Sequence, residues 1–573
     1  MSSATPHRLP LAGALRLGRP ADIWFKPALS VVAAVAPPNL ALLALGRLDL
    51  AMYTMAGSLC ALYAHNRPYA ARARTLVWVV LGMVGGLAVA LLAASLTSDA
   101  VVLVAVGALL AAVQKTVCDA TRIGPPGHVV LTFISSAALF APQTLGGIPG
   151  HLGLALAAGA WAWLIGMAPG LLRPHGPERR ATAQALNAVA AYAATHGTDA
   201  GTGTGTGDGH ARARAASAAA VHAAWQALLA AGPRPDRTRR ALERLLVRAE
   251  VALAAPADTD PARLRAWARA LRGTGPVPGV GIPAEAAAEL LGVDIELATP
   301  RPPLRRRLAP LAPLAARTAT GCALAGYASL ALGVGRPYWA LVTAASLYQA
   351  NVTLTWSRCV QRVVGNLVGV LAFAALVPLT RVHPAALVLC CLALNFGAEA
   401  LIGRNYWLGT VCVTPMALLI TEFARAQNPA ELITERVGDT LVGAVAGFLA
   451  AVVVTNRRAG ERLDHALTAA DRARESAARL LAEPDPSPRA LETARRTLAA
   501  ALVELRAVAD AAAGEWWQRA LPTERVVRTE QSGHRTLAAT VRRQGLVPQD
   551  HAPVQARAVA GRDPDSTTED TRP

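Results

Sequence analysis

The sequence predicts an all-α, polytopic membrane protein with two parallel sets of six transmembrane helices, each followed by a polar helical region. Three observations predict this fold class. About a dozen apolar runs, such as TLVWVVLGMVGGLAVALLAASL at 75–96, approach the ~20 residues that a helix needs to cross a bilayer. Only 16% of the 573 residues are charged, whereas soluble domains usually carry ~25%. The arginines gather in alternate loops between the runs instead of being spread evenly.

The first set of spans is predicted at 27–172, after a polar N-terminal segment at 1–26. Its six spans lie at 27–46, 49–65, 75–96, 99–118, 125–142 and 150–172. A polar helical region is predicted at 173–307, where Leu242, Leu245, Leu246 and Leu253 share one helix face. The Gly/Thr-rich run at 197–210 predicts a flexible linker within that region.

The second set of spans is predicted at 308–455. Its six spans lie at 308–333, 338–353, 363–380, 383–402, 406–421 and 437–455. A second polar helical region is predicted at 456–547, where Ser487 and Pro488 provide a helix-start signal before a run of regularly spaced leucines. The tail at 548–573 is predicted to be disordered.

The basic residues predict which side of the membrane each loop faces, because Lys and Arg in short loops stay on the cytoplasmic side. With the N-terminus inside, the outer loops of the first set hold Arg47 alone. The bias is weaker in the second set, where Arg336, Arg381, Arg425 and Arg436 fall outside. Both termini and both polar regions are therefore expected in the cytoplasm of a bacterial inner membrane.

The two sets also resemble each other. GRLDLAMYTMAGSL (46–59) is similar to GRPYWALVTAASL (335–347), and Gly82 and Gly86 match Gly365 and Gly369. An even number of spans per set predicts parallel repeats related by an axis along the membrane normal. Chance similarity between two Ala/Leu/Gly-rich halves is the alternative.

Composition and motifs argue against several function classes. The seven cysteines form no CxxC pair, so neither a disulfide framework nor a zinc site is indicated. No P-loop, HExxH motif or GxSxG elbow occurs, which argues against an ATPase and the common hydrolases. The net charge of +18 lies in loops and tails that flank the spans, so we expect no nucleic-acid partner. The protein is expected to be no enzyme and to bind no metal or cofactor.

Four segments of the second set resemble a known transporter family: GRPYWALVTAASLYQ (335–349), RCVQRVVGNLVGV (358–370), RNYWLGTVCVTPMALLI (404–420) and RVGDTLVGAVAG (436–447). They are similar to the FUSC family of fusaric-acid-resistance and aromatic-acid-exporter proteins, which distantly resembles plant anion transporters of the aluminium-activated malate type. The resemblance implies the six-plus-six helix pattern and export of aromatic or other organic acids, driven by the proton gradient. The polar regions match no motif of the family, so the substrate stays open.

Basic and polar residues of the second set predict an organic-anion path. Arg358 and Arg362 lie one helical turn apart with Asn366 nearby, and the arginine fork binds carboxylates and stacks on aromatic rings. We expect this group at the cytoplasmic mouth of the path, with anchoring to lipid headgroups as the alternative.

A second mouth group is predicted at Arg404, Asn405 and Tyr406, with interface-belt residues as the alternative. In the span that follows, Pro415 cannot donate a hydrogen bond and therefore frees a backbone carbonyl beside the hydroxyl of Thr414. This pattern predicts either a polar point in the path or a packing kink.

Two carboxylates inside spans, Glu399 and Asp439, are candidates for proton coupling, because burying a charged carboxylate in a membrane is costly. Each lies near an arginine, Arg404 or Arg436, so a structural ion pair is the alternative in both cases.

The expected function is efflux of small organic or aromatic carboxylic acids, with membrane lipid as a second partner and a homo-oligomer possible. A passive organic-anion channel and a membrane scaffold or envelope-assembly factor are the alternatives.

Overall fold

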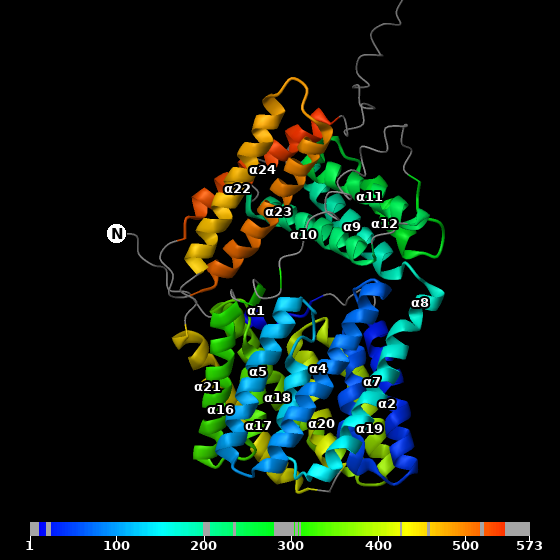
Figure 1. Ribbon diagram of the computed structural model, residues 1–573, viewed down its shortest axis with the longest axis vertical. Helices are drawn as coiled ribbons and strands as arrows, with labels where there is room; N and C mark the ends of the chain where they lie inside the picture. The colour runs from blue at the N-terminus through cyan, green and yellow to red at the C-terminus, as the bar shows by residue number, and fades with distance from the viewer. Residues whose placement is uncertain are drawn as a thin grey trace, which may run out of the picture.

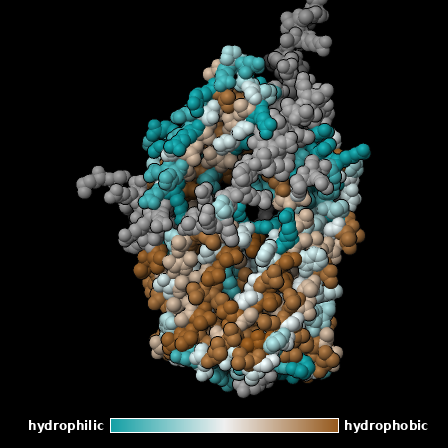
Figure 2. All heavy atoms as spheres, in the orientation of Figure 1, coloured by the Kyte–Doolittle hydropathy of each residue, from teal (hydrophilic) through white to brown (hydrophobic). Residues whose placement is uncertain are grey.

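The computed structural model describes residues 11–18, 24–198, 207–232, 236–279, 303, 307–308, 311–423, 427–454, 459–515 and 521–544. Over these residues every regular element is a helix, which confirms the all-α fold class (Figure 1). The helices form two layers along the long axis. One layer, which we call the membrane part, has a largely apolar surface, and polar helices lie on one end of it (Figure 2). The tail predicted to be disordered, 548–573, lies outside the described residues.

Each predicted span of the first set corresponds to a helix or to a broken helix. The first span is α2 (Phe25–Ala44), and the second is a broken helix of η1 (Leu48–Leu50), α3 (Ala51–Ser58) and η2 (Leu59–Leu62). The third, fourth and fifth spans are α4 (Tyr69–Leu96), α5 (Ala100–Thr121) and α6 (Val129–Leu139). The sixth is a broken helix of η3 (Leu145–Gly147), α7 (Ile148–Met167) and α8 (Pro169–Leu172). The helix α4 begins earlier than predicted because Pro68 precedes its first turn.

The second set contains α16 (Ala312–Leu332), α17 (Pro337–Leu347), α18 (Val352–Thr380), α19 (Pro384–Ile402), α20 (Tyr406–Glu422) and α21 (Pro429–Val453). Two predicted starts are wrong. The helix α18 begins at Val352 because the Asn351 side chain accepts from the backbone N–H of Leu354. The helix α21 begins at Pro429 because the Asn428 side chain accepts from the N–H of Ala430. The arginines at 358, 362 and 436, predicted to lie between spans, are therefore inside helices.

The outer surface of the membrane part is suited to lipid. Among the described residues, seven segments are long and apolar enough to cross a bilayer: α2, α4, α5, Leu145–Leu172, α18, α19 and α21. Three shorter apolar segments, Leu48–Leu62, α6 and α20, lie among them. Large apolar side chains such as Trp78 and Leu371 are each 71% exposed. Figure 2 shows that the membrane part is largely apolar on the face in view. The chain is a multi-pass membrane protein. The crossing of the membrane by all twelve predicted spans stays a prediction.

The two sets of helices pack with the same internal pattern. The second span contacts the sixth in both sets (α3 with α7, α17 with α21), and the third contacts the fifth (α4 with α6, α18 with α20). Between the sets, α2 contacts α19 and α16 contacts α5, so the first span of each set contacts the fourth span of the other. This reciprocal packing supports the predicted parallel repeat.

The polar regions form two helical groups, which we call the first and second polar bundles. The first contains α9 (Gly176–Thr198), α10 (Gly207–Ala230), α11 (Arg237–Ala254), η4 (Pro256–Asp258) and α12 (Pro261–Arg272), and the second contains α22 (Ala459–Ala482), α23 (Pro488–Ala513) and α24 (Thr523–Arg543). The predicted linker is wrong at its end, since residues 207–210 open α10. The short N-terminal helix α1 (Leu11–Ala14) contacts α18.

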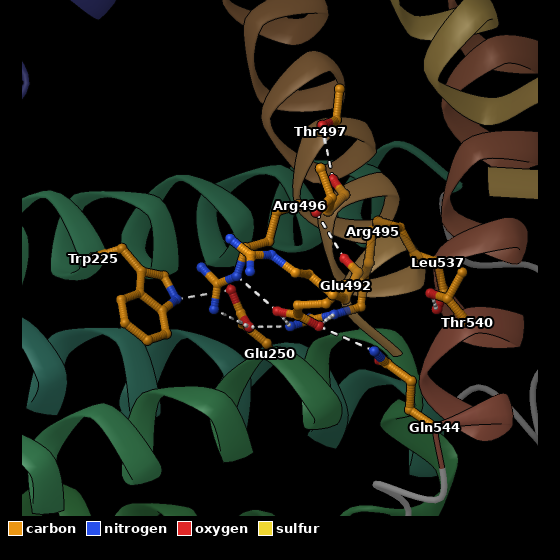
Figure 3. Close-up of polar contacts among 11 residues, drawn as sticks. Trp225, Glu250, Glu492, Arg495, Arg496, Thr497, Leu537, Thr540 and Gln544 are labelled. Carbon is orange, nitrogen blue, oxygen red and sulfur yellow. Dashed lines mark hydrogen bonds and ion pairs between the residues drawn. The ribbon is translucent and has the colours of Figure 1, made fainter. Parts of the chain in front are cut away.

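A buried polar cluster joins the two polar bundles (Figure 3). Glu492 of α23 accepts hydrogen bonds from Arg495 and Arg496, each at 2.7 Å. Arg495 also donates to Glu250 of α11 at 3.0 Å, and Trp225 of α10 donates to the same carboxylate at 2.7 Å. The guanidinium of Arg496 lies 4.5 Å from the ring centroid of Trp225. These contacts tie α23 to α10 and α11.

Candidate functional site

The second set of helices brings two arginines together in the protein interior. Arg362 on α18 is 4% exposed, and Arg436 on α21 is 1% exposed. The two guanidiniums lie within electrostatic range of each other. Burying two like charges near each other costs free energy unless other groups compensate. We call the region around this pair the arginine site. Because Arg362 is enclosed by protein, the lipid-anchoring alternative for it is disfavoured.

Aromatic side chains provide part of that compensation. The Cζ atom of Arg436 lies 3.9 Å from the ring centroid of Trp339 on α17. The Cζ atom of Arg358 lies 3.9 Å from the ring centroid of Tyr406, and Nη1 of Arg362 donates to the Tyr406 hydroxyl at 3.4 Å. A cation–π contact contributes about 0.5–2 kcal/mol, which is less than the several kcal/mol needed to bury an ion. The arginine site therefore calls for an additional acceptor.

Unused donors in the arginine site indicate the chemistry of that acceptor. Nε and Nη1 of Arg436 and Nε of Arg362 are buried and have no hydrogen-bond partner in the described part of the chain. No carboxylate forms an ion pair with either arginine among the described residues. Guanidinium N–H groups bind carboxylates in a bidentate, charge-assisted geometry. The arrangement is thus suited to an anion with a planar acceptor group and an aromatic body.

Asp439, the acid closest to Arg436 along α21, is bonded to other groups. Its Oδ1 accepts from the Ser329 hydroxyl at 2.6 Å, and its Oδ2 accepts from the backbone N–H of Arg336 at 2.9 Å. Asp439 is fully buried and ties α21 to α16 and to the start of α17. The ion pair between Arg436 and Asp439 that the spacing allowed is not formed among the described residues, where the carboxylate instead accepts from Ser329 and Arg336.

Three predicted path residues lie where α18 crosses α20. Asn366 donates to the Thr414 hydroxyl at 3.4 Å, both side chains are fully buried, and Oδ1 of Asn366 has no partner. A Cβ atom placed on Gly369 would lie 3.0 Å from the carbonyl oxygen of Val411 and 3.3 Å from the ring of Pro415. The carbonyl that Pro415 frees is thus covered by α18, which favours the packing kink for that residue.

The second predicted mouth group is divided between two roles. Nδ2 of Asn405 donates to the carbonyl of Arg16 at 2.9 Å, and the N–H of Gly18 donates to the carbonyl of Arg404 at 2.8 Å. The side chain of Arg404 is exposed. Residues 404 and 405 therefore hold the N-terminal segment against the ends of α18 and α20, and only Tyr406 reaches the arginine site.

Glu399 lies on α19, which packs against α2 and α20. Its side chain is partly buried, whereas Arg404 is exposed, and no ion pair joins the two in the part of the chain that the structure describes. The pair considered from sequence is therefore not formed. Glu399 is a carboxylate in an apolar setting without a cation beside it.

The sequence alone does not indicate Arg436 and Trp339 as members of the arginine site. The predicted last span begins at residue 437 and leaves Arg436 in the preceding outer loop, whereas α21 begins at Pro429. The dipeptide Asn428–Pro429 is a helix-start pattern, and it would have placed Arg436 inside the helix. Trp339 lies in the quoted segment 335–349, but nothing in its spacing points to the residue that it contacts.

A separate cavity of about 450 Å³ lies between the two polar bundles. It is lined by α10, α11, α23 and α24, including Trp225, Arg496 and Arg506. None of the predicted site residues lines this cavity, so it is distinct from the arginine site.

Comparison with known proteins places the similarity on the helices that form the arginine site. Residues 324–450 match the family described as fusaric acid resistance protein-like, and this segment includes both buried arginines. The uncharacterized membrane protein YvaC of Bacillus subtilis (strain 168) is 32% identical over 137 residues, which are 24% of this chain and 22% of that protein. No solved structure matches the chain. The resemblance predicted from the four motifs is confirmed over residues 324–450.

Proposed function

We propose, from the match of residues 324–450 to the fusaric acid resistance protein-like family, that this membrane protein exports small organic acids. Aromatic carboxylates are the proposed substrates. The observation that carries the proposal is the buried pair Arg362 and Arg436, with unpartnered N–H groups beside the rings of Trp339 and Tyr406. A substrate carboxylate would accept from the unpartnered N–H groups, and an aromatic body would pack against the two rings.

The residues of the arginine site have different proposed roles. Arg436 binds the carboxylate, since it retains two unpartnered nitrogens, and Arg362 provides a further N–H from the opposite helix. Arg358 holds the ring of Tyr406, which orients the hydroxyl that Arg362 contacts. Asn366, held by Thr414, offers a free amide oxygen to a ring hydroxyl on the substrate.

The membrane placement is part of the same proposal. The arginine-rich loops support an orientation in which both termini and both polar bundles lie on the cytoplasmic side of a bacterial cell membrane. We propose that export is coupled to proton entry, with Glu399 as the principal carrier. Its lack of a cation partner lets it gain and lose a proton, whereas Asp439 is fixed by two hydrogen bonds and is the second candidate.

The proposal is tested by flux measurements in proteoliposomes that contain the full chain. With an imposed proton gradient, we expect labelled benzoate to accumulate against its own gradient, while its uncharged analogue benzamide does not. Glu399→Gln is expected to lose this accumulation and to retain benzoate exchange between equal concentrations. The matched control is Glu431→Gln, at the exposed first turn of α21, which should behave as the unmodified protein.

Each other outcome points to an alternative. Equal benzoate flux with and without the gradient, unchanged in Glu399→Gln, would indicate a passive anion channel. No benzoate flux above that of empty liposomes would contradict transport and favour a scaffold.

A further inference from the structure

A basic pocket of about 200 Å³ is lined by residues of α2, α4, α8 and α9. The helix α8 leads from the membrane part toward the first polar bundle (Figure 1). Its lining comes from segments far apart in the chain. Lys26 and Ser30 belong to α2, Tyr69 and Arg72 to α4, and Arg180 to α9. The pocket is thus built by the junction of membrane helices and polar helices.

Positive charge is concentrated in this pocket. Lys26 lies within electrostatic range of Arg72, Arg173 and Arg180, and no carboxylate lines the pocket among the described residues. His65 adds no charge on the nitrogen that faces Arg72, because its Nδ1 accepts a hydrogen bond from that guanidinium at 3.1 Å. Glu178 is the acid next to the lining and interacts with His175. Among the described residues, no carboxylate of the pocket wall pairs with Lys26 or Arg72.

Arg72 provides a second and independent indication of a ligand. Its side chain is 4% exposed, and its Nε is buried without a hydrogen-bond partner. The guanidinium lies alongside Gly166 of α7, where an added Cβ would be 3.6 Å from Nη2 and 3.7 Å from Nε. Packing against α7 thus fixes a charged side chain whose Nε–H lacks an acceptor among the described residues, a costly arrangement that an anion at the guanidinium relieves.

The surface next to the pocket is apolar. Leu29, on the pocket wall, is 55% exposed, and Leu171 and Leu172 of α8 are 89% and 87% exposed. Trp24 and Phe25, at the start of α2, are also exposed. Such a band beside a cationic pocket at a membrane boundary is suited to a molecule with an anionic head and apolar chains.

We propose that this pocket binds a phosphate group, supplied by an anionic phospholipid whose acyl chains lie along Leu29, Leu171 and Leu172. The phosphate oxygens accept from the guanidinium of Arg72, from the ammonium of Lys26 and from the hydroxyl of Ser30. Free inorganic phosphate would meet the same donors without the apolar contacts, so the two sources are separable by experiment. This site is independent of the proposed transport activity.

The test measures binding to the purified, delipidated full chain in detergent. One arm follows retention of dioleoylphosphatidylglycerol by native mass spectrometry, with dioleoylphosphatidylcholine as the zwitterionic comparison. The other arm follows labelled inorganic phosphate by equilibrium dialysis. We expect selective retention of phosphatidylglycerol, weakened about tenfold in Arg72→Gln and in Lys26→Gln, because each loses a charge-assisted contact. The control is Arg74→Gln, an exposed arginine two residues along α4, which should match the unmodified protein.

The outcomes are distinct. Phosphate binding that depends on Lys26 and Arg72, without phosphatidylglycerol binding, would overturn the lipid source and keep the phosphate site. Equal binding by the unmodified protein and both variants in both arms would overturn the proposal. If Arg72→Gln fails to fold, Lys26→Gln alone decides the matter, because Lys26 lies in the first turn of its helix and is only partly buried.

Discussion

Arg436→Gln is expected to lower benzoate flux on the order of 100-fold. The substitution removes the two buried N–H donors that the arginine site offers to a carboxylate. Hydrogen bonds to a charged group contribute about 1.5 kcal/mol each, and about 3 kcal/mol corresponds to roughly a hundredfold change in binding. Initial rates of benzoate entry into proteoliposomes, across a range of concentrations, measure the effect.

The stability of the same variant separates binding from a structural role. Removing an uncompensated buried charge relieves a desolvation cost, so Arg436→Gln should have a melting temperature equal to or above that of the unmodified protein. Arg436→Lys keeps the charge but loses the fork and should give intermediate flux. Arg381→Gln, an exposed arginine that donates to the carbonyl of Gln427, is the control and should transport normally. Full flux in Arg436→Gln would contradict the assignment.

Glu492→Gln is expected to destabilise the junction between the polar bundles by about 3–5 kcal/mol, the usual cost of removing one partner from a buried ionic cluster. The variant leaves Arg495 and Arg496 buried with only Glu250 as their acid (Figure 3). Hydrogen–deuterium exchange of α23 and α11 measures the loss. Glu475→Gln, which removes an exposed acid of α22, is the control.

Acid should weaken the same junction in the unmodified protein. Burial acts to raise the pKa of Glu492, but the guanidiniums of Arg495 and Arg496 outweigh it and hold that pKa at about 2. In the unfolded chain the pKa is ~4.3, so the unfolded state takes up the proton first. The stabilisation from this group is complete above about pH 4.3 and is lost as the pH falls toward 2. In Glu492→Gln, the hydrogen–deuterium exchange rates of α23 and α11 should lack this acid-induced increase. An equal pH dependence of exchange in both proteins would contradict the role of Glu492 at the junction.

The helices were predictable because lipid demands long apolar runs, and such runs can be read directly from sequence. The starts of α18 and α21 are not predicted correctly, because polar side chains such as Arg358 and Arg436 are typical of loops between spans. In both helices those polar side chains point into protein instead of lipid. A capping asparagine before each helix, Asn351 or Asn428, was the local signal for the true start.

The arginine site itself could be predicted only in part. Arg362 and Tyr406 lie in segments that resemble a transporter family, and their residue types suggested anion binding. Their meeting with Arg436 and Trp339 depends on how α17, α18, α20 and α21 pack, which no spacing in the sequence encodes. The side chain of Asn405 is of a type suited to binding a ligand, but in the structure it holds the N-terminal segment.

The most direct test of the arginine site is a structure of the full chain with bound 4-bromobenzoate, in which the bromine marks the ring. We expect the carboxylate within ~3 Å of the guanidinium nitrogens of Arg436 and Arg362, with the ring beside Trp339. Density for the ligand only in the cavity between the polar bundles, or none at the arginine pair under saturating conditions, would contradict the account.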